Sequence, residues 1–336
     1  MSIKPTVLVV YLEKRERYIK EARIENLLNE FTNIYSANVI QLSDRVLETE
    51  PVENWPLCDI SLTLYLDKYN YPPSILDKIN DYTSLRKPYI LNNCEFREVL
   101  RNRIDIYTIL HELAILTPKF EVGDYKKIKK PFIEKPVSAD EHDIVIYHAQ
   151  GGSTKIQVKP EFGTKIKESE NSIPRCDSRC PSEVTPENGD NRTFIYEQFL
   201  ENATEVKIKV IGDNYAHGEA RDGTDKGVQR DTKNQRETRV STELTEQELE
   251  YAAKIQRTFK QFFIGFDVLR YEGKSYVIDV NDQAWLPKTG REEFFKNAAI
   301  LMGQKIIREA AFLNLTLNIT NQLDEGVAAG GWGVVS

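Results

Sequence analysis

Residues 265–281 read GFDVLRYEGKSYVIDVN, and this stretch is the most informative part of the sequence. Apolar and polar residues alternate on both sides of Glu272-Gly273, which predicts two strands joined by a short turn and directs Asp267, Asp279 and Asn281 toward one place. Carboxylate and amide oxygens are ligands that suit Mg²⁺, which commonly completes its coordination with water and substrate phosphate. The hairpin therefore points to phosphoryl chemistry. Asp and Asn also favour turns after a strand, so the hairpin alone leaves both readings open.

Composition excludes several classes of protein. The chain has 336 residues, of which 40% are hydrophobic, enough for two or so domains of roughly 150 residues each. A formal net charge of -7 argues against a nonspecific nucleic-acid coat, so an anionic ligand must be met by a local cluster of cations. No stretch approaches the ~20 apolar residues of a membrane span, no signal-peptide cleavage site follows the start, and the few cysteines show no paired CxxC spacing. We expect a monomer of the cytosol or nucleus, without a membrane span or a nucleic-acid partner.

The order of elements predicts an α/β and α+β protein. Strand-like runs at 5–12, 37–42, 59–66 and 88–92 alternate with helical patterns at about 15–31 and 74–86. This alternation indicates a small parallel sheet covered by helices, and we place this N-terminal α/β domain at residues 1–93. A long amphipathic helix over 94–115 follows and ends before Thr117-Pro118.

The rest of the chain has a different character. Residues 118–240 contain one strand pattern after another, which indicates antiparallel sheet, interrupted by a polar and mobile excursion at 166–192. A helix within 242–263, capped by Thr242 or Thr245 with Glu248 in its first turn, precedes the acidic hairpin, and a helix over 291–312 follows it. We assign 94–315 to a second domain and the low-complexity residues 316–336 to a disordered tail.

Familiar phosphate-binding motifs are missing from the sequence. Gly273-Lys274-Ser275 imitates the end of a P-loop, but the position five before Gly273 is Val268, and strands flank the motif. There is also no HRD loop and no DFG of the protein-kinase type. A nucleotide would therefore be bound by another architecture.

The order of a lysine-bearing strand, an apolar strand and the acidic hairpin resembles an ATP-grasp fold, in which the nucleotide lies between two antiparallel sheets. Over roughly residues 5–312 the chain is similar to the kinase domain of the diphosphoinositol pentakisphosphate kinase family. The strings that carry the resemblance are EPVENWPLCD at 50–59, FIEKPVSADEHD at 132–143, IYEQF at 195–199, DNYAHGEAR at 213–221, VQRD at 228–231, GFDVLR at 265–270 and SYVIDVN at 275–281. Family members usually carry a histidine-phosphatase-like domain after the kinase, so we expect either a kinase-only member or a truncated chain.

The resemblance implies ATP and Mg²⁺ as cofactors. Lys135 would contact the nucleotide phosphates, backbone groups of 197–200 would form the adenine hinge, and Glu205 would accept a ribose hydroxyl. A nucleotide-contacting arginine of the family falls at Ile104 or, with a shift of one residue, at Arg103, which we favour. The implied nucleotide ligands are Arg103, Lys135, His142, Glu197, Gln198, Phe199, Leu200, Glu205, Lys207, Asp267, Asp279 and Asn281, and the last three would hold the metal.

The resemblance also implies a cationic acceptor site. Arginine offers planar forks that bind phosphate by paired hydrogen bonds. An ordinary solvated sheet face would carry a similar composition, so the cations alone leave both readings open. The implied substrate ligands are Lys14, Arg15, Lys159, Lys207, Arg221, Arg230, Arg239 and Lys288, and we take Lys135, Arg230 and Asp279 as the catalytic residues.

The activity that the resemblance implies is ATP-dependent phosphorylation of an existing phosphate on inositol hexakisphosphate or diphosphoinositol pentakisphosphate, which forms an inositol pyrophosphate. Two alternatives stay open. Carboxylate-amine ligases share the fold, and fold does not fix function. A non-catalytic inositol-polyphosphate sensor is the other, for which Asp282, where the family usually has Gly, is evidence if it spoils the metal geometry. The ring position and the preferred acceptor stay open as well.

Overall fold

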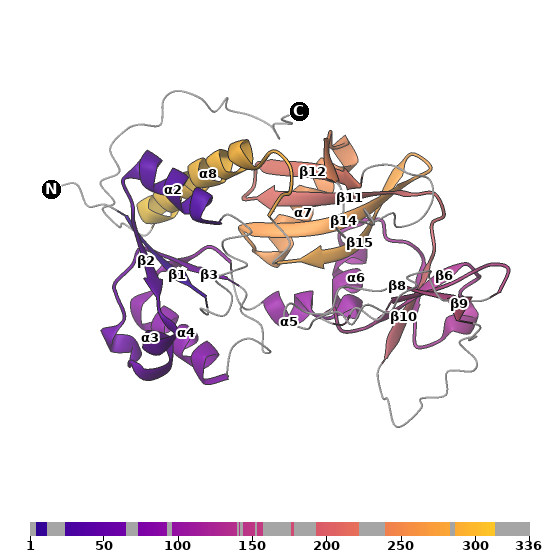
Figure 1. Ribbon diagram of the computed structural model, residues 1–336, viewed down its shortest axis with the longest axis horizontal. Helices are drawn as coiled ribbons and strands as arrows, with labels where there is room; N and C mark the ends of the chain where they lie inside the picture. The colour runs from indigo at the N-terminus through magenta and orange to yellow at the C-terminus, as the bar shows by residue number, and fades with distance from the viewer. Residues whose placement is uncertain are drawn as a thin grey trace, which may run out of the picture.

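The computed structural model contains three sheets, with helices packed on them (Figure 1). The residues it describes are 5–11, 24–64, 73–92, 96–139, 141, 144–151, 153–156, 176–177, 193–221, 239–282 and 286–312. Within these ranges, no helix combines the length and the apolar character needed to cross a membrane.

The N-terminal sheet is parallel throughout, as predicted, with the strand order β2-β1-β3-β4. Every position of the central strand β1 is apolar or shielded because both faces of the sheet are covered. Val7 and Val9 point toward α2, whereas Leu8 and Val10 point toward α3 and α4. The elements are β1 (Thr6–Val10), α2 (Ile24–Tyr35), β2 (Asn38–Leu42), α3 (Asp44–Thr49), the 3₁₀ turn η2 (Val52–Asn54), β3 (Ile60–Thr63), α4 (Pro73–Arg86) and β4 (Tyr89–Ile90).

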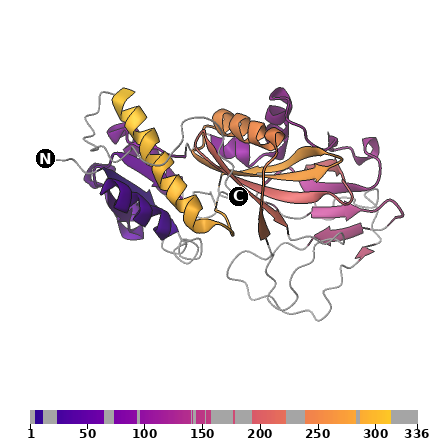
Figure 2. The same ribbon diagram turned by 90° about the horizontal axis from the view of Figure 1, so that it is seen from above.

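The last helix, α8 (Arg291–Phe312), crosses back to the N-terminal sheet and lies along α2 (Figure 2). Phe294, Phe295 and Met302 share a core with Val7 and Val9. The helices approach closely at Gly303, where an added Cβ would lie 2.0 Å from the ring of Tyr35. The helix that follows the acidic hairpin in sequence therefore completes the core of the N-terminal sheet.

The second sheet is antiparallel, with the order β5-β10-β6-β7-β8-β9. It forms the edge of the molecule opposite the N-terminal sheet (Figure 1). Its elements are β5 (Phe120–Val122), the 3₁₀ turn η4 (Tyr125–Lys127), β6 (Phe132–Pro136), β7 (Ile144–Tyr147), β8 (Ser153–Ile156), β9 (Cys176–Asp177) and β10 (Phe194–Gln198).

The third sheet lies between the other two, is antiparallel, and has the order β13-β12-β11-β14-β15. The helix α7 (Glu246–Phe259) covers its apolar face. Thr245 caps α7 and forms a capping box with Glu248, which confirms the second of the two predicted caps. The strands are β11 (Thr204–Ile211), β12 (Tyr215–Arg221), β13 (Arg239–Thr242), β14 (Phe263–Tyr271) and β15 (Lys274–Asn281).

The predicted single helix over 94–115 is wrong. Two helices occupy its described part, α5 (Arg97–Leu100) and α6 (Arg103–Glu112). Asn102 separates the two helices because its side chain caps α6, accepting from the N–H groups of Ile104 at 2.9 Å and Asp105 at 3.4 Å. The N–H of Arg103 donates to the carbonyl of Val137 at 2.9 Å, which ties the break to the end of β6.

Candidate functional site

One face of the five-stranded sheet is polar and charged. Lys207 pairs with Asp267, and Asp267 pairs with Asp279, across β11, β14 and β15. The next pair on the same face joins Gly265 to Asn281. Since paired residues place their side chains on one face, the three predicted metal ligands lie close together. We call this surface the charged face, and it comprises Glu205, Lys207, Lys209, Glu219, Arg221, Arg239, Asp267, Asp279 and Asn281.

A β-bulge sets the orientation of Asp279. Val268 pairs with Val277 while Asp267 pairs with Asp279, so Ile278 is an extra residue in β15. Val277 is fully buried in the core beneath α7. The bulge therefore turns the strand between Val277 and Asp279, and the second of these side chains faces the charged side of the sheet.

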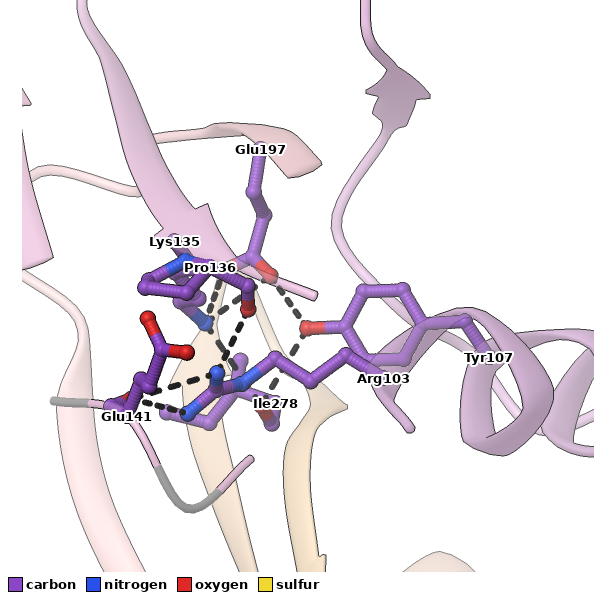
Figure 3. Close-up of polar contacts among 7 residues, drawn as sticks. All are labelled: Arg103, Tyr107, Lys135, Pro136, Glu141, Glu197 and Ile278. Carbon is purple, nitrogen blue, oxygen red and sulfur yellow. Dashed lines mark hydrogen bonds and ion pairs between the residues drawn. The ribbon is translucent and has the colours of Figure 1, made fainter. Parts of the chain in front are cut away.

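The strand lysine lies in a buried network (Figure 3). Lys135 of β6 donates to both carboxylate oxygens of Glu197 on β10, at 3.0 and 2.9 Å. Tyr107 of α6 donates to the same carboxylate and to the carbonyl of Ile278 at 3.1 Å. Burial raises the pKa of Tyr107 well above its ordinary value, and Glu197 adds to this, so the phenol stays a neutral donor. We expected only the backbone of Glu197 to matter, but its side chain orients Lys135.

Arg103 holds the end of β6 and the segment that follows it through hydrogen bonds to backbone carbonyls. Its guanidinium is buried and donates to the carbonyl oxygens of Pro136 at 2.6 Å and Glu141 at 3.4 Å (Figure 3). It also donates to the carbonyl oxygen of Ser138 at 2.7 Å. Its charge also opposes the effect of burial on the pKa of Asp279. The neighbouring Ile104 packs against the hydrophobic core. Of the two positions considered for the nucleotide-contacting arginine, Arg103 is therefore the one whose side chain lies near Lys135 and Asp279.

The two aspartates of the charged face differ in their electrostatic surroundings. Burial raises the pKa of Asp279, and the adjacent Asp267 carboxylate raises it further. Burial acts in the same direction on Asp267, but Lys207 and Lys209 outweigh it and hold that pKa below its ordinary value. Two carboxylates that repel each other, with the amide of Asn281 at the next pair of residues along the hairpin, are a set of oxygen donors that suits a divalent cation. Among the described residues no group of three His, Cys, Asp or Glu side chains that could hold a metal ion is found.

A second cluster surrounds Glu205. Arg221 contacts its carboxylate at 2.9 Å, Arg239 at 3.2 Å and Lys207 at 3.5 Å. Lys207 also forms an ion pair with Asp267. The structure thus brings together three of the predicted acceptor ligands. Glu205, the predicted ribose ligand, lies between them as a shared counter-charge.

Several polar residues beside this cluster were not predicted. Glu219 is buried and accepts from the N–H groups of Lys288 and Thr289, both at 2.6 Å, and from the Thr289 hydroxyl at 2.9 Å. His217 contacts Thr289 at 3.2 Å, and burial lowers its pKa. Glu219 therefore holds the segment that bears Lys288 against β12. The pattern in DNYAHGEAR contains a signal for these residues, since His217, Glu219 and Arg221 alternate along one strand.

Lys209 is a further residue that sequence reasoning missed. It lies two positions after Lys207 on β11, so both side chains share the charged face. It is almost completely buried, and burial lowers its pKa to about 8. Asp267 and Glu219 act on this pKa in the opposite direction.

Some backbone groups of the predicted adenine hinge already form hydrogen bonds within the protein. The N–H of Gln198 donates to the carbonyl of Lys119 at 2.8 Å, and that of Phe199 donates to the carbonyl of Pro131 at 3.1 Å. Both groups hold the end of β10 in place, so a nucleotide would have to use other backbone groups of this stretch, as far as Leu200.

Five predicted ligands lie outside the described residues. They are Lys14, Arg15, His142, Lys159 and Arg230, and the proposed excursion at 166–192 and tail at 316–336 also fall largely or wholly outside.

Two family models match separate parts of the chain. Residues 7–102 match the family model of the diphosphoinositol pentakisphosphate kinase 2 N-terminal domain, and residues 183–309 match that of the RimK-like ATP-grasp domain. A D-alanine–D-alanine ligase from Bacillus anthracis has the same fold, with a TM-score of 0.54 at 13% identity, covering 93% of this chain and 99% of the ligase. The predicted ATP-grasp fold is therefore confirmed.

Curated relatives are more similar in sequence. The inositol hexakisphosphate and diphosphoinositol-pentakisphosphate kinase 2 of Mus musculus is 29% identical over 331 residues, covering 90% of this chain and 27% of the relative. The corresponding kinase of Caenorhabditis elegans is 32% identical over 295 residues, covering 80% of this chain and 21% of the relative. The chain thus spans about a quarter of the length of these relatives. It belongs to the diphosphoinositol pentakisphosphate kinase family, over the segment with the N-terminal domain and the ATP-grasp domain.

Proposed function

We propose that the chain is an ATP-dependent kinase that phosphorylates an existing phosphate of inositol hexakisphosphate or diphosphoinositol pentakisphosphate. The observation that carries the proposal is the similarity to such kinases along 90% of the chain. The charged face supports it because a polyphosphorylated ring requires many cations in one place. The product would be an inositol pyrophosphate.

The nucleotide end of the site consists of Lys135 and its supports. Glu197 and Tyr107 fix the ammonium group, and Arg103 holds the adjoining chain. Phosphoryl transfer depends mainly on positioning and on stabilising charge at the phosphate oxygens. A lysine held at a defined place can do both for the triphosphate.

Asp267, Asp279 and Asn281 would hold Mg²⁺. They fit this ion, since all three are oxygen donors at neighbouring register positions of one hairpin. When bound, Mg²⁺ offsets negative charge on phosphate oxygens. Repulsion between the two carboxylates favours its arrival, and the Lys207 ammonium must then share Asp267 with the metal.

The cations proposed to bind the acceptor are, among the described residues, Arg221, Arg239, Lys207 and Lys288. Outside the described residues we add Arg230, Lys159, Lys14 and Arg15. A phosphate oxygen is already ionised at neutral pH, so transfer to it requires no strong general base. Glu205 holds three of these cations before the acceptor arrives. Acceptor phosphates would compete with this carboxylate for the same guanidinium groups, which favours polyanions over singly charged ligands.

A direct test is to incubate the protein with Mg-ATP and either inositol hexakisphosphate or 5-diphosphoinositol pentakisphosphate and to resolve the products by phosphorus NMR. We expect diphosphate resonances to appear together with ADP. Binding of the inositol phosphate without transfer would favour the sensor. ADP formation only in the presence of a carboxylate and an amine would favour a ligase.

The remaining expectations concern the surroundings of the enzyme. We propose a monomer of the cytosol or nucleus that does not bind nucleic acid. We place a domain boundary near residue 93, and the chain crosses it a second time where α8 joins the core of the N-terminal sheet. Analytical ultracentrifugation tests the oligomeric state, and titration with duplex DNA tests the lack of nucleic-acid binding.

A further inference from the structure

A cavity of about 270 Å³ lies at the junction of the N-terminal sheet, α7, α8 and the turn between β11 and β12. Arg257 and Lys260 reach it from the end of α7, and Lys305 and Arg308 reach it from α8. The carboxylate in its lining is that of Asp213. The cavity is therefore strongly positive although the whole chain carries a formal net charge of -7.

The floor of the cavity is apolar and held by backbone hydrogen bonds. The N–H of Phe262 donates to the carbonyl of Leu91 at 3.0 Å, and the N–H of Gly212 donates to the carbonyl of Phe262 at 2.7 Å. Gly212 has a φ of 52°, and an added Cβ would lie 3.2 Å from the Phe262 ring. These contacts preform the cavity, a property that ligand sites commonly share.

This cavity is separate from the charged face. It opens beside α7, which covers the apolar face of the same sheet, and its lining residues differ from all the proposed nucleotide, metal and acceptor ligands. Any ligand bound here would therefore leave the charged face accessible.

Helix electrostatics explain only part of the charge. Cations at the C-terminal end of a helix stabilise its dipole, which accounts for Arg257 and Lys260 on α7. The last turn of α8 contains no basic residue, so Lys305 and Arg308 have no such role. Arg257 and Arg308 are both exposed, and neither forms an ion pair within the part of the chain that the structure describes. Convergence of cations from two helices on one cavity is the arrangement that binds a multiply charged anion.

We propose that this cavity binds a small anion with two or more phosphate groups, at a second site distinct from the charged face. Arginine forks at the rim suit phosphate oxygens, and the small volume limits the ligand to a few phosphate groups on a compact body. Because α8 belongs to the core of the N-terminal sheet and α7 to that of the central sheet, a bound anion would brace these two cores together.

Inorganic tripolyphosphate is a suitable probe, and the full chain is the protein to use. Calorimetric titration should resolve two classes of site, of which Arg257→Ala/Arg308→Ala weakens one at least tenfold and leaves the other unchanged. Hydrogen exchange should show protection by tripolyphosphate at residues 212–214 and 257–262 in the wild type and in Arg221→Ala, but not in the double variant. Both arginines are exposed, so the unfolding temperature of the double variant should match that of the wild type.

The matched control is Arg45→Ala/Lys126→Ala, which removes two exposed positive charges from positions outside the cavity. Its affinity for tripolyphosphate should equal that of the wild type. The conservative Arg257→Lys/Arg308→Lys variant should retain part of the binding. The proposal is overturned if the double alanine variant binds like the wild type, if the control loses binding equally, or if protection is confined to the charged face.

Discussion

The ion pair between Lys135 and Glu197 allows a quantitative test by a double-mutant cycle. The two residues are 6% and 0% exposed, and the ammonium bonds both carboxylate oxygens. Removing one partner of a buried pair leaves an uncompensated charge and costs about 3–5 kcal/mol, a large part of the ~5–15 kcal/mol that stabilises a typical domain. We therefore expect Lys135→Met and Glu197→Gln each to lower the free energy of unfolding by roughly this amount.

The double variant should behave differently. With both charges gone, the amide oxygen introduced by Glu197→Gln can still accept from Tyr107, so the remaining loss should be about 1–2 kcal/mol, the value of a few neutral hydrogen bonds. Urea unfolding at pH 7 of the four proteins gives the coupling free energy directly. Kinase activity provides a second readout, because Lys135→Met and the double variant should both lack it. Additive losses in the double variant would refute the view that the two charges act as one unit.

Three other predictions address the metal, the acceptor and the core. Asp279→Ala should reduce transfer by at least about a hundredfold with the fold intact, measured by product formation at saturating Mg-ATP; activity within a few-fold of wild type would exclude the metal assignment. Arg221→Ala should raise the acceptor KM about tenfold, which corresponds to ~1.4 kcal/mol, more at low than at high salt, and Arg221→Lys should restore only part of it; identical constants would contradict the acceptor site. Burial would raise the pKa of Glu248, but hydrogen bonds from Arg270 and Ser275 outweigh it, so its folded pKa lies below the ordinary value. The stability that Glu248 contributes is therefore complete above the unfolded pKa of about 4.3 and is lost as pH falls through the lower folded pKa. Glu248→Gln should make the midpoint of urea unfolding depend less on pH across this range. An unchanged pH dependence of the midpoint would contradict this linkage.

Local patterns in the sequence were enough to predict the acidic hairpin, the parallel N-terminal sheet and the cap of α7. The hairpin and the cap depend on residues close together in the chain, such as the turn at Glu272-Gly273, where both φ angles are positive. The parallel sheet followed from the alternation of strand and helix patterns. The break between the two helices at Asn102 was not predicted, because the hydrophobic periodicity of the sequence continues unchanged through the residue that caps α6.

The missed parts of the site have a common cause. Glu197 and Lys209 gain their roles from strand pairing and Tyr107 from the packing of α6 against the strands, and a single strand pattern reveals neither. Glu197 was placed correctly in its strand, yet its partner Lys135 lies 62 positions earlier in the chain. Family resemblance supplied the proposed nucleotide, metal and acceptor ligands but not the side chains that support them.

The extra residue at Ile278 gives the two antiparallel sheets a link through the main chain. A bulged residue has no partner in the ladder, and the carbonyl of Ile278 instead accepts from the Tyr107 hydroxyl at 3.1 Å and from the Lys135 ammonium at 3.5 Å. Deleting Ile278 would still leave Val277 and Asp279 on opposite faces, since neighbours in a regular strand alternate, but it would remove this acceptor. A substitution changes only the side chain and leaves the carbonyl in place. The hairpin should therefore tolerate many side chains at residue 278, whereas loss of the residue itself would uncouple the position of Lys135 from that of the acidic hairpin.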